Sequence, residues 1–240
     1  MNKKEFKIFI DFDGTITRVD VGSAIFEKFG EPTAVAEVIT KYLKDDVSAK
    51  ECWLLLCDSI KDLDLKEFDK YIESFEVDST FHDFIKYCED NNFEHYVLSD
   101  GFDYYIEKIL KKEKLENLKY YSNKLLIDEN NNLTPVFPYL DEESKTSANC
   151  KHNHIINHSS DEEFTVYIGD GISDKETAEF CDFIFAKDDL LKFCEKERIT
   201  YFPYNNFHDV IKKLDELKSR KRLKKRHQAS LKRREVYLRG

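Results

Sequence analysis

The chain has 240 residues, of which 41% are hydrophobic and 14% aromatic, and its 48 acidic and 38 basic side chains give a net charge of −10. This length and apolar content can fill a substantial core, so the sequence predicts a globular protein with room for an inserted module. It has no run near the roughly 20 apolar residues of a membrane helix, no leader-like start and no CxxC pair among six scattered cysteines. We therefore expect a cytoplasmic protein with reduced thiols and no membrane partner.

The first strand-like run, at residues 7–10, ends in two carboxylates, Asp11 and Asp13, which are followed by Gly14 and Thr15. Open α/β sheets bind ligands at the carboxyl ends of their strands, and glycine permits a tight turn there. Asp11 could act as a nucleophile, and Asp13 could protonate a leaving oxygen and later accept a proton from water. The same pattern also fits a helix N-cap or an ordinary turn, so the rest of the chain decides between these interpretations.

The segment from residue 18 to residue 78 shows helical rather than strand periodicity. Asp20, Ser48 and Asp64 stand where helix N-caps are expected, and the Gly-Glu-Pro sequence at residues 30–32 separates the first two helices. We therefore predict a helical cap inserted after the first strand, closing over the open edge of the sheet. Its helices are expected at Val21–Phe29, Thr33–Leu43, Ser48–Ile60 and Leu65–Phe75.

The remaining sequence alternates strand-like and helical segments, which predicts a doubly wound α/β sheet. A second apolar run, residues 95–98, ends in Ser99, Asp100 and Gly101, and a third, residues 165–168, is followed by Asp170 and Asp174. Further elements are expected as a helix at Phe102–Leu115, a hairpin at Tyr120–Phe137 turning at residues 128–132, and strands at Phe183–Ala186 and Ile199–Phe202.

Lys151 is a cationic residue that lies in the sequence between the second and the third strand-like runs. A lysine ammonium and a serine hydroxyl can hold the negative charge of a phosphoryl group, and Mg²⁺ binds carboxylate oxygens while keeping several waters. Lys145 is the alternative lysine. Lys151 opens a short helical stretch just before the third strand.

The ordered set of segments resembles the four motifs of the haloacid dehalogenase superfamily, specifically its phosphatases, over roughly residues 6 to 215. The resemblance implies a Rossmann-like, doubly wound, mostly parallel sheet at 1–17 and 79–217 and a helical cap at 18–78. A basic tail at 218–240 lies outside it. The resemblance also implies Asp11 as the nucleophile and Asp13 as the acid and base. The residues implied in phosphate binding are Thr15, Ser99, Gly101 and Lys151. The implied cofactor is Mg²⁺, held by Asp11, Asp13 (through its main-chain carbonyl), Asp170 and Asp174, the last directly or through water.

The position of the cap resembles the subfamily, termed IB, that contains phosphoserine phosphatases and the 2-hydroxy-3-keto-5-methylthiopentenyl-1-phosphate phosphatases of methionine salvage. Residues 11–17, the Ser-x-Gly-x-Asp of residues 99–103, Cys150-Lys151 and residues 185–191 carry this likeness, which is nearer to the second enzyme. It implies a phosphatase that hydrolyses a small phosphorylated metabolite through an aspartyl-phosphate intermediate. No arginine lies between Arg18 and Arg198, which disfavours a substrate carboxylate such as that of phosphoserine.

Asp100 follows the expected phosphate ligand directly and is a candidate specificity residue. A carboxylate near the entrance would repel anionic substrate tails and favour amines, and the Ser99-Asp100 pair resembles that of phosphoethanolamine and phosphocholine phosphatases. An amino-alcohol phosphate is therefore one candidate substrate. A loop carboxylate that faces water is the alternative.

The last 23 residues, 218–240, hold eleven of the 38 basic side chains and one acid, Glu235. Such a tail could bind nucleic acid or anionic lipid, but the strongly acidic remainder would repel nucleic acid. Leu217, Leu223, Leu231 and Leu238 give sparse apolar support for a packed helix. Charge compensation within the molecule, a solvated helix and an appended segment that the core does not need therefore stay open as alternatives. Two other functions stay open: transfer of the phosphoryl group to a small alcohol instead of water, and nucleic-acid binding through the tail on a non-catalytic fold.

Overall fold

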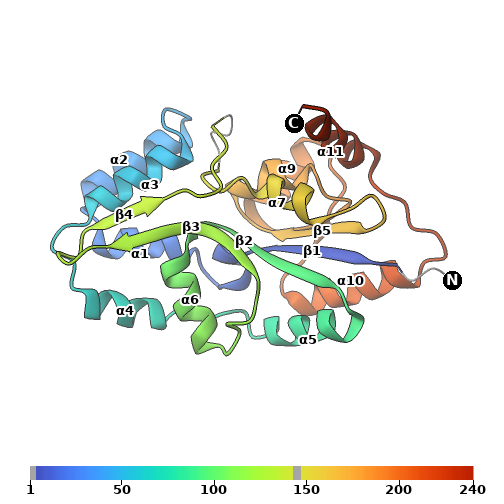
Figure 1. Ribbon diagram of the computed structural model, residues 1–240, viewed down its shortest axis with the longest axis horizontal. Coiled ribbons are helices and arrows are strands. Elements are labelled where there is room, and N and C mark those ends of the chain that lie inside the picture. The colour runs from blue at the N-terminus through green and yellow to red at the C-terminus, as the bar shows by residue number, and fades with distance from the viewer. Residues whose placement is uncertain (1–3, 143–146, 240) are drawn as a thin grey trace. The chain divides into compact units, whose positions relative to one another are not determined.

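The computed structural model describes residues 4–142 and 147–239, so the alternative lysine, Lys145, lies outside the described residues. Within them the chain forms two compact units (Figure 1). Unit 1 contains the described residues up to Ile16, then Asp78–Leu98, and the described residues from Lys151 onward. Unit 2 contains Thr17–Val77 and the described part of Ser99–Cys150.

The centre of unit 1 is a set of parallel strands with β1 (Phe6–Asp11) in the middle. Every residue of β1 is buried, as expected for a strand that is covered on both faces. It pairs in parallel with β2 and β5, and β5 and β6 continue the parallel pairing outward. The partner strands are β2 (Glu94–Phe102), β5 (Phe164–Gly169), β6 (Phe183–Ala186) and β7 (Phe202–Pro203).

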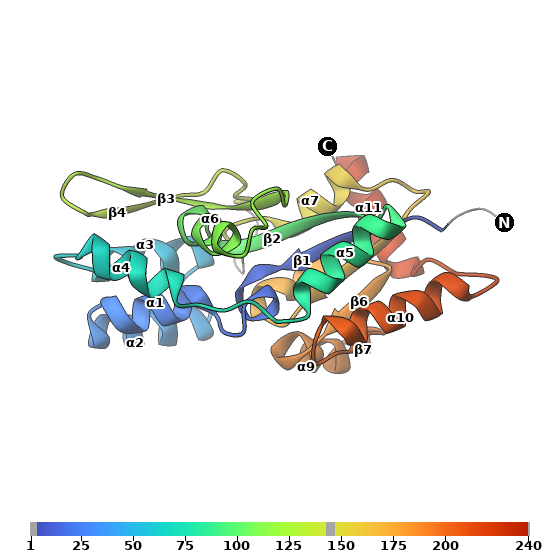
Figure 2. The same ribbon diagram turned by 90° about the horizontal axis from the view of Figure 1, so that it is seen from below.

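Helices of unit 1 follow or precede these strands, and α5 and α10 lie side by side in both views (Figures 1 and 2). Aromatic rings join the two helices, because Phe207 of α10 packs on Phe81 and Phe84 of α5 with ring centroids 4.9 and 5.0 Å away. The helices are α5 (Phe81–Asn91), α7 (Lys151–His158), α8 (Lys175–Ala178), α9 (Asp188–Lys196), α10 (Phe207–Ser219) and α11 (His227–Arg239).

The helices of the insertion agree with the sequence prediction to within about two residues at each end, which is the ordinary spread of helix boundaries. The side chains of Asp20 and Asp64 accept hydrogen bonds from first-turn amides, and Ser48 forms a capping box with Glu51, so all three predicted N-caps are confirmed. The helices are α1 (Val21–Phe29), α2 (Pro32–Leu43), α3 (Ala49–Ser59) and α4 (Leu65–Glu73).

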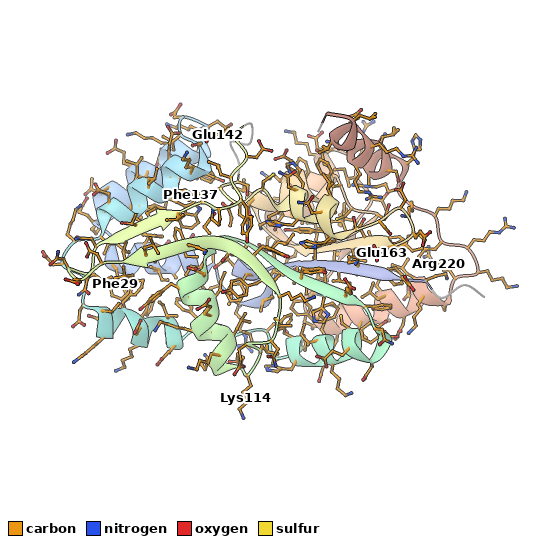
Figure 3. The ribbon with its side chains drawn as sticks, in the orientation of Figure 1. Phe29, Lys114, Phe137, Glu142, Glu163 and Arg220 are labelled. Atoms are coloured by element: carbon orange, nitrogen blue, oxygen red, sulfur yellow. The ribbon has the colours of Figure 1, made fainter. Side chains whose placement is uncertain are left out.

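Aromatic side chains hold these helices together inside unit 2. Phe29, at the end of α1 and labelled in Figure 3, makes edge contacts with Phe68 and Tyr71 of α4 at centroid distances of 5.3 and 5.6 Å. Trp53 of α3 packs similarly on Phe102, at 4.9 Å. Aromatic pairs of this kind add about 1 kcal/mol each beyond their area burial.

Unit 2 extends further along the chain than the predicted cap, because α6 and the β3–β4 hairpin also belong to it. Tyr104 of α6 donates to Asp69 of α4 at 2.7 Å, and Asn131 in the hairpin turn donates to the carbonyl of Leu63 at 2.9 Å. The hairpin turns at residues 128–132 as predicted. These elements are α6 (Asp103–Lys112), β3 (Tyr120–Ile127) and β4 (Leu133–Val136).

Among the described residues the strands form one seven-stranded sheet in the order β4-β3-β2-β1-β5-β6-β7. The predicted α/β fold, a Rossmann-like, mostly parallel sheet, is thereby confirmed. The predicted strand at Ile199–Phe202 needs correction, since β7 contains only Phe202 and Pro203. Arg198 adopts a left-handed conformation, φ 55°, and the amide of Ile199 still bonds back to Cys194, so the chain is leaving α9 at these positions.

The basic tail forms helix α11, which packs within unit 1. This packing favours charge compensation within the molecule over an appended segment. The expected leucines do not hold the helix, because Leu231 is 44% exposed and Leu238 88% exposed. Ala229 and Arg233 are buried instead, and Arg226 donates to the carbonyls of Ala178 and Glu179 at 2.6 and 2.5 Å. Helix α11 is thus anchored mainly by polar contacts, which a search for apolar periodicity does not detect.

All six cysteines are buried thiols. Across the described residues, no helix combines the length and the apolar character that crossing a membrane would require.

Candidate active site

The residues predicted for the first and fourth motifs meet at one edge of unit 1. Strands β1 and β5 run parallel with Ile10 beside Ile168, so Asp11 and Asp170 leave the sheet at the same end. Asp11 is also in register with Leu98 of β2. Ser99 is the next residue of the β2 chain.

The turn after β1 depends on Gly14, which has a φ of +77°. A side chain there would be strained, and its Cβ would lie 2.5 Å from Asp170 Oδ2. Glycine therefore lets the backbone turn approach the Asp170 carboxylate. Thr15 follows and donates its hydroxyl to Asp170 Oδ1 at 2.6 Å.

Lys151 begins helix α7 and has a side chain with no exposed surface. Its ammonium lies 2.5 Å from Asp11 Oδ1 and 2.7 Å from Asp174 Oδ1, and it also donates to Ser173 Oγ at 3.1 Å. A fully buried ammonium requires such partners, because an unpaired buried charge is very costly. The structure therefore brings together the residues predicted as nucleophile, third-motif cation and fourth-motif acid.

Asp174 is held by protein donors on both of its carboxylate oxygens. Oδ1 accepts from Lys151 and from the Tyr167 hydroxyl at 2.5 Å, and Oδ2 accepts from the amides of Asp170 and Gly171 at 3.0 and 2.9 Å. Gly169 makes room for this arrangement, since a Cβ at that residue would lie 2.4 Å from Asp174 Oδ2. These bonds occupy the main lone-pair directions of the carboxylate.

Three carboxylates crowd this edge, and Lys151 is the cation that pairs with two of them. Oxygen atoms of Asp11, Asp170 and Asp174 all lie within 4.8 Å of one another. Burial and the neighbouring charge of Asp174 raise the pKa of Asp170 to about 7, against the effect of the Thr15 hydrogen bond. Burial first and then Asp174 raise the pKa of Asp11, while Lys151 opposes the shift. The local excess of negative charge is of the kind that a bound cation relieves.

Asp13 differs from Asp11 in its access to solvent. Asp11 is buried, whereas Asp13, two residues later in the turn, is partly exposed. A group that exchanges protons with a leaving oxygen and with water needs such access. The two acids of the first motif therefore occupy environments that suit different roles.

Ser99, Asp100 and Gly101 of the second motif belong to unit 2 and are described there. Ser99 is buried, and its Oγ accepts a hydrogen bond from the amide of Gly101 at 2.9 Å, which closes a small turn. The Ser99 carbonyl accepts from Asn149 Nδ2 at 2.7 Å. The Asp100 carboxylate accepts hydrogen bonds from other residues of unit 2.

Three site residues were not assigned a role from the sequence: Tyr167, Ser173 and Tyr204. Tyr204 is buried, and its hydroxyl lies 3.4 Å from Thr15 Oγ1 and donates to the Gly169 carbonyl, also at 3.4 Å. For Tyr167 a signal existed, because a tyrosine inside a fully buried strand must find a partner for its hydroxyl. The sequence did not tell which partner that would be.

Known proteins resemble this chain over most of its length. A family model described as Putative Phosphatase matches residues 6–197. A curated 2-hydroxy-3-keto-5-methylthiopentenyl-1-phosphate phosphatase of Bacillus mycoides (strain KBAB4) is 34% identical over 218 residues, covering 88% of this chain and 96% of the relative. The enzyme of the same name from Bacillus cereus (strain B4264) is 34% identical over 215 residues, covering 85% and 93%.

Solved structures share the fold. One described as a phospho-aspartyl intermediate analogue of phosphoserine phosphatase superposes with a TM-score of 0.67 at 20% identity, covering 88% of this chain and 99% of that one. At a sequence identity of 20%, this similarity is evidence for the fold alone.

Proposed function

We propose a magnesium-dependent mechanism for this chain. The chain belongs to the Putative Phosphatase family. It is a phosphatase of the haloacid dehalogenase type, that is, a phosphoric monoester hydrolase. The proposed reaction is hydrolysis of a small phosphate monoester through an aspartyl-phosphate on Asp11. The observation that carries it is the buried Lys151 ammonium between Asp11 and Asp174, at an edge where three acids converge.

The residues at this edge fit Mg²⁺. All available ligand atoms are oxygens, which this ion prefers. Burial and the neighbouring charge of Asp174 raise the pKa of Asp170, and a bound cation would favour its charged form. We assign Asp11, the Asp13 main-chain carbonyl and Asp170 as ligands. Asp174 would act indirectly, because its oxygens already accept four hydrogen bonds. The ion would supply charge neutralisation for the phosphoryl oxygens.

Asp11 is proposed as the nucleophile. One of its carboxylate oxygens attacks phosphorus in line with the ester oxygen, the P–O bond to the leaving group breaks, and an aspartyl-phosphate forms. Lys151 holds Asp11 at 2.5 Å and places a positive charge beside the phosphoryl oxygens. Thr15, Ser99 and Gly101 are the further phosphate-binding candidates.

Asp13 is proposed to move the protons. In the first step it gives its proton to the leaving alkoxide oxygen. In the second step a water attacks the aspartyl-phosphate and Asp13 takes the water's proton, which releases inorganic phosphate and restores both carboxyl groups. The partial exposure of Asp13 supports this role, because the leaving group and the water must both reach it.

The substrate is proposed to be a small, phosphorylated metabolite without a carboxylate. The Bacillus relatives carry the name of a phosphatase that acts on a methionine-salvage intermediate, and this supports a substrate of that type. The arginine-free stretch between Arg18 and Arg198 disfavours phosphoserine. A panel of phosphorylated metabolites, assayed with Mg²⁺ in water and with added small alcohols, would identify the substrate and would reveal any transfer to an alcohol.

The mechanism is tested with two substitutions and two leaving groups. We expect Asp11→Asn to lower turnover of p-nitrophenyl phosphate more than about a thousandfold, and Asp13→Asn to lose far more activity with an alkyl phosphate than with this ester, whose leaving group needs no proton. Substantial steady turnover by purified Asp11→Asn would refute the nucleophile assignment. Equal losses of kcat/KM, which reports the phosphorylation step, with both esters would refute the role of Asp13 as the acid.

A further inference from the structure

The Asp100 carboxylate is bound on both oxygens by unit 2 itself. Oδ1 accepts three hydrogen bonds, each 2.7 Å long, from the Ser147 hydroxyl and the amides of Ala148 and Asn149. Oδ2 accepts a fourth from the indole Nε1 of Trp53, at 3.3 Å. Three consecutive residues, 147–149, thus donate to the same carboxylate oxygen.

The segment that Asp100 holds leads directly into the third motif, since residues 147–149 are followed by Cys150 and Lys151. A second set of bonds ties the same segment to the second motif, because Asn149 Nδ2 donates to the carbonyls of Ser99 and Tyr121 at 2.7 and 2.9 Å. The Asp100 carbonyl in turn accepts from Asn123 Nδ2 at 2.6 Å. Asp100 and Asn149 therefore bond reciprocally, each fixing the loop that contains the other.

Helix α3 of the insertion joins this arrangement through Trp53. The indole ring packs on Phe102 at 4.9 Å, and on Phe26 at 5.7 Å, so its Nε1–H is held toward Asp100 by buried contacts on two sides. Gly22 is needed beside it, since a Cβ there would lie 2.9 Å from Trp53 Cη2. The second-motif turn, the approach to the third motif and the insertion are thus connected within one unit.

We propose that Asp100 is a positioning residue, which fixes the Ser99–Gly101 turn to the segment preceding Lys151. The inference rests on the proposed function, in which Ser99 and Lys151 bind the phosphoryl group. The lone pairs of Asp100 serve hydrogen bonds inside the protein, and this favours a positioning role over the contact with a substrate amine that the sequence suggested. The relevant property of the side chain is its oxygen acceptor and not its charge.

Four variants separate acceptor from charge. Asp100→Ala removes both acceptor oxygens of the side chain. The double variant, Asp100→Asn with Trp53→Phe, removes the charge but keeps one oxygen for the three donors of residues 147–149. The Trp53→Phe change is included so that the new amide N–H does not face the indole N–H. Trp53→Phe alone is the background for the double variant. Asp58→Ala, an exposed acid of α3, is the matched control for loss of one negative charge.

The kinetic measurements are kcat, KM and the inhibition constant of inorganic phosphate, on a neutral, an amine-bearing and a carboxylate-bearing phosphate ester. We expect Asp100→Ala to lower kcat/KM about tenfold on all three esters alike and to weaken phosphate inhibition. The double variant should stay within about threefold of Trp53→Phe. The preference is measured as the ratio of kcat/KM for the amine-bearing ester to kcat/KM for the carboxylate-bearing ester. If the double variant and Asp100→Ala change this ratio by the same factor, the charge of Asp100 is decisive and the positioning role is wrong.

Hydrogen exchange tests the same inference without activity. Asp100→Ala should accelerate exchange of the Ala148 and Asn149 amides at least about tenfold, while the double variant keeps their protection. Unchanged protection in a folded Asp100→Ala would overturn the proposal. Failure of the proposed function would instead show as a wild-type protein that hydrolyses no ester with Mg²⁺, and the exchange result would still decide the role of Asp100.

Discussion

The two ends of strand β5 differ in how the buried charges beside them are balanced. At its beginning, Thr165 and Asp182 are buried beside Arg233, whose guanidinium lies 3.4 Å from both Asp182 oxygens and donates to Thr165 Oγ1 at 3.0 Å. At its end, Asp170 lies beside two further acids that share a single lysine. One end is balanced and the other carries excess negative charge.

The difference separates a structural charge from a functional one. A buried ion pair whose members are both hydrogen-bonded needs no ligand, whereas crowded carboxylates with raised pKa values are the pattern found where proteins bind cations or move protons. Stability lost at the functional end must be offset elsewhere in the fold. The docked helix α11 contributes to that offset, since it brings Arg233 to Asp182.

Removing the balancing charge at the beginning of β5 should have the largest effect on folding. Arg233→Ala leaves Asp182 buried without its cation, so we expect the free energy of unfolding to fall by about 3–5 kcal/mol in a denaturant titration. The neighbouring Arg234 is exposed on the same helix, and Arg234→Ala should cost no more than about 0.5 kcal/mol. Equal costs for the two variants would mean that α11 does not anchor the core, as would a truncation at residue 219 that left stability unchanged.

A cation at the other end of β5 should have the next largest effect. Mg²⁺ at about one hundred times its dissociation constant should stabilise the folded state by about 2.7 kcal/mol, by mass action, and raise the melting temperature. Asp170→Asn should abolish both this shift and Mg²⁺-dependent activity. Retention of full activity by EDTA-treated wild-type protein would contradict the proposed metal site.

The pH dependence of metal-free protein offers a finer test of the same end. The pKa of Asp170 is raised from an ordinary 3.8 to about 7 in the folded state, so the folded state binds the proton more tightly and this group's contribution to stability is lost as pH rises through about 7. With EDTA present, the wild type should therefore lose stability relative to Asp170→Asn between about pH 4 and pH 7, and the difference should level off above pH 7. A constant difference between their melting temperatures across this range would show that Asp170 does not titrate there.

The Tyr167 hydroxyl should have the smallest effect. Tyr167→Phe removes one hydrogen bond to Asp174 and leaves its other three, so kcat should fall by less than about tenfold and the free energy of unfolding by about 1 kcal/mol. Tyr201→Phe, which removes an exposed hydroxyl bond to Glu195, is the control and should change neither. A loss of activity as large as that of Asp170→Asn would make Tyr167 part of the chemistry instead of its support.

Local features of the fold could be predicted because their signals lie within a few residues. The N-caps at Asp20, Ser48 and Asp64, the hairpin turn at 128–132 and the strand ending in Asp11 each depend on side chains and amides of the same segment. The strand expected at 199–202 was wrong, because Arg198 is left-handed and the amide of Ile199 still bonds to Cys194, so pairing with β6 begins only at Phe202.

The sequence by itself determined that acids stand at the ends of β1 and β5, because strand-forming residues followed by Asp and Gly are local features. Only the tertiary structure decided what each charge does. Arg233 meets Asp182 across 51 residues of chain, Lys151 meets Asp11 across 140, and Asp100 meets the 147–149 segment across 47 to 49. Such partners are selected by strand register and helix docking, which place one group within hydrogen-bonding distance and leave chemically identical neighbours, such as Arg234, in water.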